Sequence, residues 1–342
     1  MTASARALKQ SAPSKCGETE TRVHVTAQLY LLTESELGGL TGERLEPMKL
    51  QRIVLATALT FVVAGISHAA QRNEGEGDKC SNIHVGDWDK ATARGEEDLT
   101  VPNTGGTLQI IAHRNGGVAV RGSDVGNFKV HVCKIAAGNT DADAKRILSQ
   151  IKVETANGTV RPTGPEGEEW TAFLIVDAPR SASISAETHN GPLSFRNLQG
   201  ALTATAKNGP VSFRHVSGSV SANVVNGPVS YSGNSGDIKM ESRNGPLDVK
   251  LEGTNWSGGG GLQATTVNGP LSLSVPDGFE SGIDVQTSGH APVSCSVKDC
   301  VATQSVNSDD QMRHIRFGSG SPVVRISTHN GPVSIHSSRA ED

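Results

Sequence analysis

Between residues 181 and 336 the hydrophobic and polar positions alternate with a period of two, and the pattern recurs at a fixed interval. The triplet Asn-Gly-Pro begins at positions 190, 208, 226 and 244, so three successive steps are each 18 residues long. It returns at 268 and 330, and a degenerate copy, His-Ala-Pro, begins at 290. Such a period is typical of one structural unit stacked on itself.

Each period predicts two strands joined by tight corners. After the Pro, apolar residues alternate with small or polar ones, as in Val211-Ser212-Phe213, and this alternation indicates a strand with one buried face. A second alternation follows after a Gly, for example at Gly218. We expect the Gly of the triplet to supply a positive φ at the corner, and the Pro to fix the direction of the outgoing chain. Helices do not fit, because a Gly-Pro pair in every period would interrupt them.

The predicted fold class is all-β: a β-solenoid, like a parallel β-helix, with turns of about 18 residues, preceded by a β-rich entry module that contains one short helix. In a solenoid, equivalent residues of successive turns lie roughly 4.8 Å apart, which favours identical columns. The repeated Asn side chains are then expected to form a hydrogen-bonded amide ladder; its members are Asn190, Asn208, Asn226, Asn244 and Asn268. The alternative is an antiparallel meander or sandwich, in which Asn-Gly forms simple hairpin turns.

The chain divides into six predicted segments. They are an untranslated or unstructured extension (1–47), a signal peptide (48–70), a flexible polar leader (71–98), the entry and capping module (99–180), the solenoid repeats (181–336) and a polar tail (337–342). A helix is predicted near 141–151, where Thr140 and Asp143 form a capping box and apolar residues share one stripe. We expect this helix to cover the first open end of the array, and the last triplet, at 330, to close the array.

The signal peptide is predicted from three adjoining features. Residues 48–52 are a short basic start, residues 53–66 are apolar and uncharged, and residues 67–69 have the small side chains of a cleavage site. The apolar run is too short to span a bilayer comfortably. We therefore expect translation to start at Met48 and the protein to be exported to the periplasm, cell envelope or extracellular space; the alternative is a segment retained as a membrane anchor.

Five cysteines are present, and Cys16 precedes the predicted signal. The other four permit two disulfides in an exported chain. We favour Cys80–Cys133 and Cys295–Cys300, because each pair lies within one region. Zinc is the alternative, but the sequence has no paired Cys-x-x-Cys spacing and no His cluster to support it, so no metal is expected.

Composition and charge narrow the functional classes. A net charge of −4 provides no basic field for nucleic acid, while 4% aromatic residues and 39 glycines suit thin repeat cores. Residues 253–262 lengthen one period from 18 to 24 residues and carry Trp256. This Trp is expected either to pack over the repeats or to contact a sugar or a partner.

No catalytic residues or cofactor-binding residues are predicted. The sequence has no nucleophile elbow, phosphate loop or His-Glu-x-x-His motif. Glycoside cleavage needs two facing carboxylates, and the only acidic doublet in the repeat region, Asp309-Asp310, is expected in an irregular loop. The expected outward face carries instead a row of hydroxyls with a short basic stripe, namely Ser194, Ser212, Ser230 and Ser272 with Arg196 and Arg214.

Three features carry a resemblance to a known family. They are the Val-Ala-Val-Arg-Gly phrase at 118–122, the end of the predicted helix at 147–154, and the Thr/Val-Asn-Gly-x-Val/Leu repeats from His189 to Leu273. In this order they resemble the bacterial "putative adhesin" repeat family of exported β-solenoid proteins of unknown function, over roughly residues 100–335. The family usually has Gly where this chain has Pro at 192, 210, 228 and 246. The resemblance implies a surface or envelope role.

The function predicted is a non-catalytic exported scaffold or adhesin-like interaction module that binds a glycan or another envelope protein. One alternative is a carbohydrate-active β-helix enzyme, which requires a groove with two carboxylates roughly 5–10 Å apart. Another is an accessory protein of envelope-stress signalling. Nucleic acid is not an expected partner, and no transmembrane span is expected beyond the signal segment.

Overall fold

A computed structural model describes residues 80–83, 89–288, 291–297, 300, 304–306 and 312–338, all within one compact unit. The predicted N-terminal extension, the signal peptide and the Asp309-Asp310 doublet lie outside the described residues. Within the part of the chain that the structure describes, no helix is long and apolar enough to cross a membrane.

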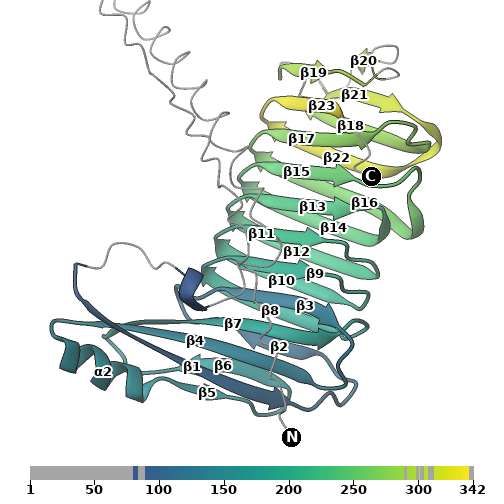
Figure 1. Cartoon of the computed structure of the whole chain (residues 1–342). Helices are drawn as coiled ribbons and strands as arrows, with labels where there is room; N and C mark the ends of the chain where they lie inside the picture. Colours follow the sequence, from purple (N-terminus) through teal and green to yellow (C-terminus); the bar gives the residue numbers. More distant parts are fainter. Residues whose placement is uncertain are drawn as a thin grey trace, which may run out of the picture. The chain divides into compact units, whose positions relative to one another are not determined.

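The described residues form an all-β fold of two large mixed sheets with one α-helix, α2 (Asp141–Gln150), and a short 3-10 segment, η2 (Cys80–Asn82) (Figure 1). In spatial order, sheet A contains β1 (Ala91–Val101), β4 (Phe128–Gly138), β7 (Glu169–Pro179), β3 (Val118–Ser123), β9 (Leu193–Arg196), β11 (Val211–Arg214), β13 (Val229–Gly233), β15 (Leu247–Leu251), β17 (Leu271–Pro276), β23 (Val333–Ser338) and β19 (Val293–Cys295). Sheet B contains β20 (Gln304–Val306), β21 (Met312–Phe317), β18 (Ser281–Ser288), β22 (Ser319–Asn330), β16 (Ser257–Asn268), β14 (Ser235–Asn244), β12 (Ser219–Asn226), β10 (Leu202–Asn208), β8 (Ile184–Asn190), β2 (Leu108–Ile111), β6 (Thr159–Thr163) and β5 (Lys152–Glu154).

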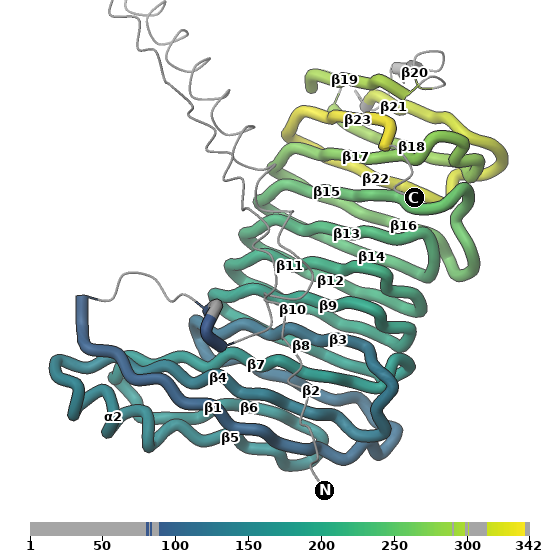
Figure 2. Tube along the Cα trace, in the orientation of Figure 1, coloured from purple at the N-terminus to yellow at the C-terminus, as the bar shows by residue number. Residues whose placement is uncertain are grey.

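Each 18-residue repeat contributes one strand to each sheet, and Figure 2 shows the chain passing between the sheets at every level. Strands of neighbouring repeats pair in parallel with like residues opposite one another. Asn208 on β10 is opposite Asn190 on one side and Asn226 on the other, and Phe213 on β11 is opposite Phe195 and Tyr231. Residues 18 apart in the sequence are therefore direct neighbours on adjacent strands.

The core lies between the two sheets. Alternate residues of each strand point inward, so that Leu202, Ala204 and Ala206 of β10 are buried while the residues between them are exposed. From sheet A, Phe195 and Phe213 stack with ring centroids 5.1 Å apart. One continuous cluster of buried residues runs from β1 to β23, and its removal from water is the main force that holds the sheets together.

The first strands belong to the same two sheets as the repeats. β2 pairs in parallel with β8, and β3 pairs in parallel with β9. Helix α2 begins after Thr140, whose side chain accepts a hydrogen bond from the backbone N–H of Asp143. It buries Ala144 and Ile147, and Ile147 joins the core cluster. The single predicted helix is thus present.

One segment expected in the flexible leader is a strand. Residues 91–98 form most of β1, which pairs antiparallel with β4 at the edge of sheet A. Their polar character misled the prediction, because an edge strand tolerates charged side chains on its solvent face. Alternate residues of β1 are exposed, and the strand is held by its ladder with β4.

The expected role of the triplet glycines was also wrong in part. Gly191, Gly269 and Gly331 occupy the corner without the left-handed backbone conformation. What they share with Gly209, Gly227 and Gly245 is a lack of space: a Cβ at each of these six would lie 2.0–2.2 Å from a backbone carbonyl oxygen in the adjoining level. Close approach of stacked backbones is what excludes a side chain at all six positions, and Gly209, Gly227 and Gly245 have a positive φ in addition.

The last repeat does not close the array. β22 lies between β16 and β18, and β23 lies between β17 and β19, so the last two strands in sequence are inserted beside β16 and β17, ahead of β18 and β19. Asn330 thereby meets Asn268 and donates a hydrogen bond to it over 2.9 Å. The degenerate copy has His rather than Asn at position 290 of the sequence.

The lengthened period packs its Trp onto the array. Trp256 is half-buried against the core, its ring lies 6.0 Å from that of Tyr231, and its Nε1 donates to the carbonyl of Gly236 over 3.2 Å. Of the two alternatives, packing over the repeats is the one observed.

The corner glycines of the Asn-Gly-Pro triplets allow the close contact between backbones of neighbouring repeats to be tested. Gly227→Ala places a methyl group against the Gly209 carbonyl in a backbone that cannot retreat, and we expect it to lower the free energy of unfolding by about 2–3 kcal/mol. Gly126→Ala, in open space, should change it by about 0.5 kcal/mol or less. Denaturant unfolding followed by circular dichroism measures both; equal effects would contradict the stacking constraint.

Candidate functional site

The Asn side chains of the triplets form a continuous row of hydrogen bonds. In each case Nδ2 of one Asn donates to Oδ1 of the Asn on the neighbouring level, over 2.7–3.0 Å. The row runs through Asn115, Asn190, Asn208, Asn226, Asn244, Asn268 and Asn330. The sequence predicted five members of this ladder, and the structure adds Asn115 and Asn330. These two lie 75 and 62 residues along the chain from their hydrogen-bond partners Asn190 and Asn268.

Both favoured cysteine pairs are disulfides in the structure. Cys80 on η2 is bonded to Cys133 on β4, with a Cα–Cα distance of 5.4 Å, and Cys295 is bonded to Cys300, with a Cα–Cα distance of 6.4 Å. The first joins positions 53 residues apart and fixes η2 to the outer face of sheet A. The second closes a short loop near the far end.

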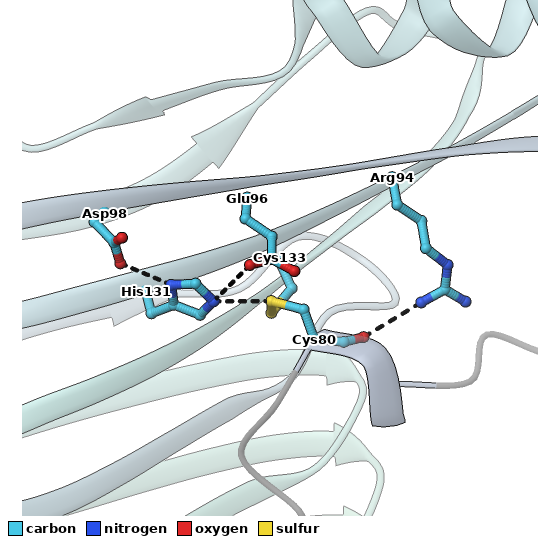
Figure 3. Close-up of polar contacts among 6 residues, drawn as sticks. All are labelled: Cys80, Arg94, Glu96, Asp98, His131 and Cys133. Carbon is cyan, nitrogen blue, oxygen red and sulfur yellow. Dashed lines mark hydrogen bonds and ion pairs between the residues drawn. A yellow bond between two sulfur atoms is a disulfide. The ribbon is translucent and has the colours of Figure 1, made fainter. Parts of the chain in front are cut away.

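A polar cluster surrounds the first disulfide, and strand pairing accounts for it. In the antiparallel ladder of β1 and β4, Glu96 is opposite Cys133 and Asp98 is opposite His131. Residues two apart on a strand share a face, so all four side chains are on one side of sheet A, away from the core. Figure 3 shows Cys80 reaching this group from η2.

His131 is the centre of this cluster. Its Nε2 lies 3.0 Å from Sγ of Cys80 and 3.5 Å from Oε2 of Glu96, and its Nδ1 lies 2.7 Å from Oδ1 of Asp98 (Figure 3). Nε2 and the two sulfur atoms all lie within 4.8 Å of one another. The sequence did not reveal this group, because the ladder that brings His131 beside Cys80 is not visible in residue spacing.

A second candidate is a polar cavity of about 980 Å³ between the segment that follows β2 and the loop that joins β6 to β7. His113 stacks on Trp170 there, with ring centroids 3.6 Å apart and planes 17° from parallel. Nε1 of Trp170 donates to the carbonyl of Pro165 over 3.0 Å and ties the loop down. Burial lowers the pKa of His113, and the charge of Arg114 lowers it further.

Two of the acidic residues that line this cavity form ion pairs with residues outside its lining. Glu168 forms an ion pair with Arg146 at 3.1 Å, and Glu169 forms one with Lys90 at 2.8 Å. Trp170 is 5% exposed, its ring stacks on that of His113, and Gly164 lies so close to the indole that a Cβ there would clash with it. The indole is therefore enclosed by the protein and offers no face for a sugar ring.

A buried carboxylate near the far end has a structural role. Asp284 on β18 accepts from Gln286 at 3.0 Å and lies 3.3 Å from His314 and 3.4 Å from Arg316, both on β21. Burial by itself would raise the pKa of Asp284, but these hydrogen bonds outweigh burial and the pKa is lowered. The cluster fastens β21 to β18.

The polar surfaces of the repeats differ between the sheets. The hydroxyl row predicted from sequence lies on sheet A, where Ser194, Ser212, Ser230 and Ser272 are each half-buried. The outer face of sheet B is more open. It carries two polar columns across five paired strands, β10 to β22: Thr203, Ser221, Lys239, Gln263 and Arg325, then Thr205, Asn223, Glu241, Thr265 and Ser327.

The sheet B columns are exposed on most levels, and only Thr265 and Ser327 among them are half-buried. No motif marks these positions in the sequence, because their residue types vary from one repeat to the next. The alternation of apolar and polar residues along each predicted strand was the one sequence feature that could have indicated these outward positions.

Comparison with known proteins gives a limited picture. No protein-family model and no curated protein matches the chain. Among solved structures, it is similar to a "putative cell adhesion protein" from Clostridium sporogenes, with 11% identity and a TM-score of 0.32 over 72% of this chain and 100% of that one. A "putative adhesin" from Parabacteroides distasonis has 10% identity and a TM-score of 0.33, over 73% and 98%.

A third similar structure, a "putative lipid binding protein" from Parabacteroides distasonis, has 10% identity and a TM-score of 0.26 over 72% of this chain and 96% of that one. The names of the first two match the family that the repeats resemble. Likeness at this level says nothing about activity or partner.

The lowered pKa of His113 predicts a pH dependence. The unfolded chain protonates this His near pH 6.5, whereas the folded chain does so only at lower pH, so its contribution to stability is present above about 6.5 and is lost as pH falls below that value. We expect His113→Gln to remove this part of the decline in unfolding free energy. His329→Gln, at an exposed position, should leave the decline unchanged; identical pH profiles for wild type and His113→Gln would contradict the assignment.

Proposed function

We propose that this chain is an exported, non-catalytic interaction module, built as a β-solenoid, that binds a repetitive ligand through the outer face of sheet B. The ligand class is a polysaccharide, whose identical units recur along its length. Export is supported by the two disulfides, which persist in oxidising compartments, and by the signal-like pattern at 48–70. The solenoid is supported by the parallel, in-register pairing of successive repeats.

The observation that carries the proposal is the pair of polar columns on sheet B. Their side chains occur on neighbouring strands, which lie roughly 4.8 Å apart, and they point away from the core. Thr203, Thr205, Ser221 and Asn223 provide donors and acceptors on two adjoining levels. A chain of identical sugar units can repeat one set of hydrogen bonds along such a surface, so that many weak contacts add up.

The enzyme alternative is less well supported by the carboxylates of the described residues. Cleavage of a glycosidic bond needs one acid and one base or nucleophile facing each other across the substrate. Asp177 is paired with Arg121 at 2.7 Å, and Glu241 with Lys239 at 3.1 Å. Glu252 lies 3.3 Å from His215 and accepts a hydrogen bond from Ser232.

A polysaccharide array probed with the purified protein tests the proposal. We expect binding to one or more repeating glycans without release of sugar fragments. The double variant Thr205→Val with Asn223→Leu removes hydrogen-bonding groups while it keeps the branching and the number of heavy atoms of each side chain, and it should weaken binding by at least about tenfold. The matched control Ser212→Ala with Ser230→Ala, on sheet A, should bind as wild type does.

Two results would contradict the proposal. One is that cleavage products accumulate, which would favour the enzyme. The other is that the sheet A variant loses binding while the sheet B variant keeps it, which would move the binding surface to the opposite face.

A further inference from the structure

We propose that reduction of the Cys80–Cys133 disulfide converts the cluster on β1, β4 and η2 into a zinc site. The ligands are Sγ of Cys80, Sγ of Cys133, Nε2 of His131 and a carboxylate oxygen of Glu96. This site lies on sheet A, is independent of the glycan surface and adds a second capacity to the molecule.

The positions of the donor atoms carry the proposal. The two sulfurs and Nε2 of His131 lie within 4.8 Å of one another, and Oε2 of Glu96 lies 3.5 Å from the same Nε2. In a tetrahedral zinc site the Zn–S and Zn–N distances are about 2.3 Å and 2.1 Å, which places neighbouring ligand atoms roughly 3.5–4 Å apart. Once the S–S bond is broken, small movements of the two thiol side chains give this spacing.

The donor set also suits zinc chemically. Two thiolates, one imidazole and one carboxylate are all zinc ligands found in proteins, and thiolates select it over calcium or magnesium. Asp98 completes the arrangement, since its carboxylate lies 2.7 Å from Nδ1 of His131. A His that ligates a metal through one nitrogen commonly donates its other N–H to a carboxylate, which fixes the ring.

The site is held in place by the backbone around it. Cys133 and His131 are on the same face of β4. Arg94 of β1 donates to the carbonyl oxygen of Cys80 over 3.3 Å (Figure 3) and to that of Ile83 over 3.0 Å, which anchors η2. Cys80 and Cys133 are both buried, at 7% and 1% exposure. Among the described side chains, the Cys295–Cys300 disulfide belongs to no comparable group of metal ligands.

The chemical step is a two-electron reduction followed by metal exchange for protons. A dithiol reductant transfers two electrons and two protons to the S–S bond, which breaks to give two thiols, while the reductant becomes its own disulfide. Binding of Zn²⁺ then displaces both thiol protons and forms two Zn–S bonds. In the reverse step a disulfide oxidant accepts two electrons from the two thiolates and two protons from solvent and becomes two thiols, while the S–S bond forms again and Zn²⁺ leaves.

The experiment uses the full chain in oxidised form and after reduction with a phosphine, which does not compete for zinc. Zinc content is measured after gel filtration, and Co²⁺ serves as a spectroscopic probe. We expect one bound ion per chain after reduction and none before it. The cobalt spectrum should show thiolate-to-metal charge transfer and the d–d bands of tetrahedral geometry.

Variants assign the ligands. Asp98→Asn should weaken zinc binding by about 10- to 100-fold, and His131→Asn, which removes a ligand, should weaken it further. The matched controls are Cys295→Ser with Cys300→Ser, and the exposed His329→Asn, and these should retain full binding. Circular dichroism of each reduced variant shows whether the fold persists.

Several results would overturn the proposal. They are a reduced, folded protein that takes up no zinc, equal uptake by oxidised and reduced protein, and unchanged binding by His131→Asn. If reduction unfolds the chain, zinc should restore the fold of wild type but not of His131→Asn; failure of that restoration would equally contradict the site.

Discussion

Close contact between the backbones of successive repeats governs this structure. Where Gly227 lies on Gly209, there is no room for a Cβ, so the Asn-Gly-Pro repeats carry Gly at this corner and their corners lie one over another. That contact sets the register, and the register then places Asn on Asn and Phe on Phe. The hydrogen-bonded Asn row and the continuous core both follow this register.

The pairing register also determines which side chains lie next to one another on the outer faces of the two sheets. Because side chains alternate along each strand, fixing the inward residues leaves the intervening ones in straight columns on the surface. On sheet B these columns are open and polar, which suits a ligand with its own repeat. At the edge of sheet A the same alternation puts Asp98, His131 and Cys133 on one face, where η2 brings Cys80 to them. Two separate chemical surfaces thus follow from strand geometry.

The sequence was informative wherever structure follows from local spacing. The 18-residue period located the repeat strands, Thr140 located the start of the helix, and proximity along the chain favoured the disulfide pairs that are observed. It was uninformative about long-range pairing. The antiparallel partnership of β1 and β4 turns a polar stretch into a strand and puts His131 beside a disulfide. The insertion of the last coil beside Asn268 depends on a contact across 62 residues, which no spacing rule contains.

Like residues of successive repeats are paired in parallel register, and cysteine cross-linking measures this pairing directly. Thr205 and Asn223 are direct partners on β10 and β12, whereas Glu241 is one strand further away on β14. The account predicts efficient disulfide formation in Thr205→Cys with Asn223→Cys and little in Thr205→Cys with Glu241→Cys, as read by peptide mass spectrometry. Comparable yields in the two variants, or none in the first, would contradict the stacked register.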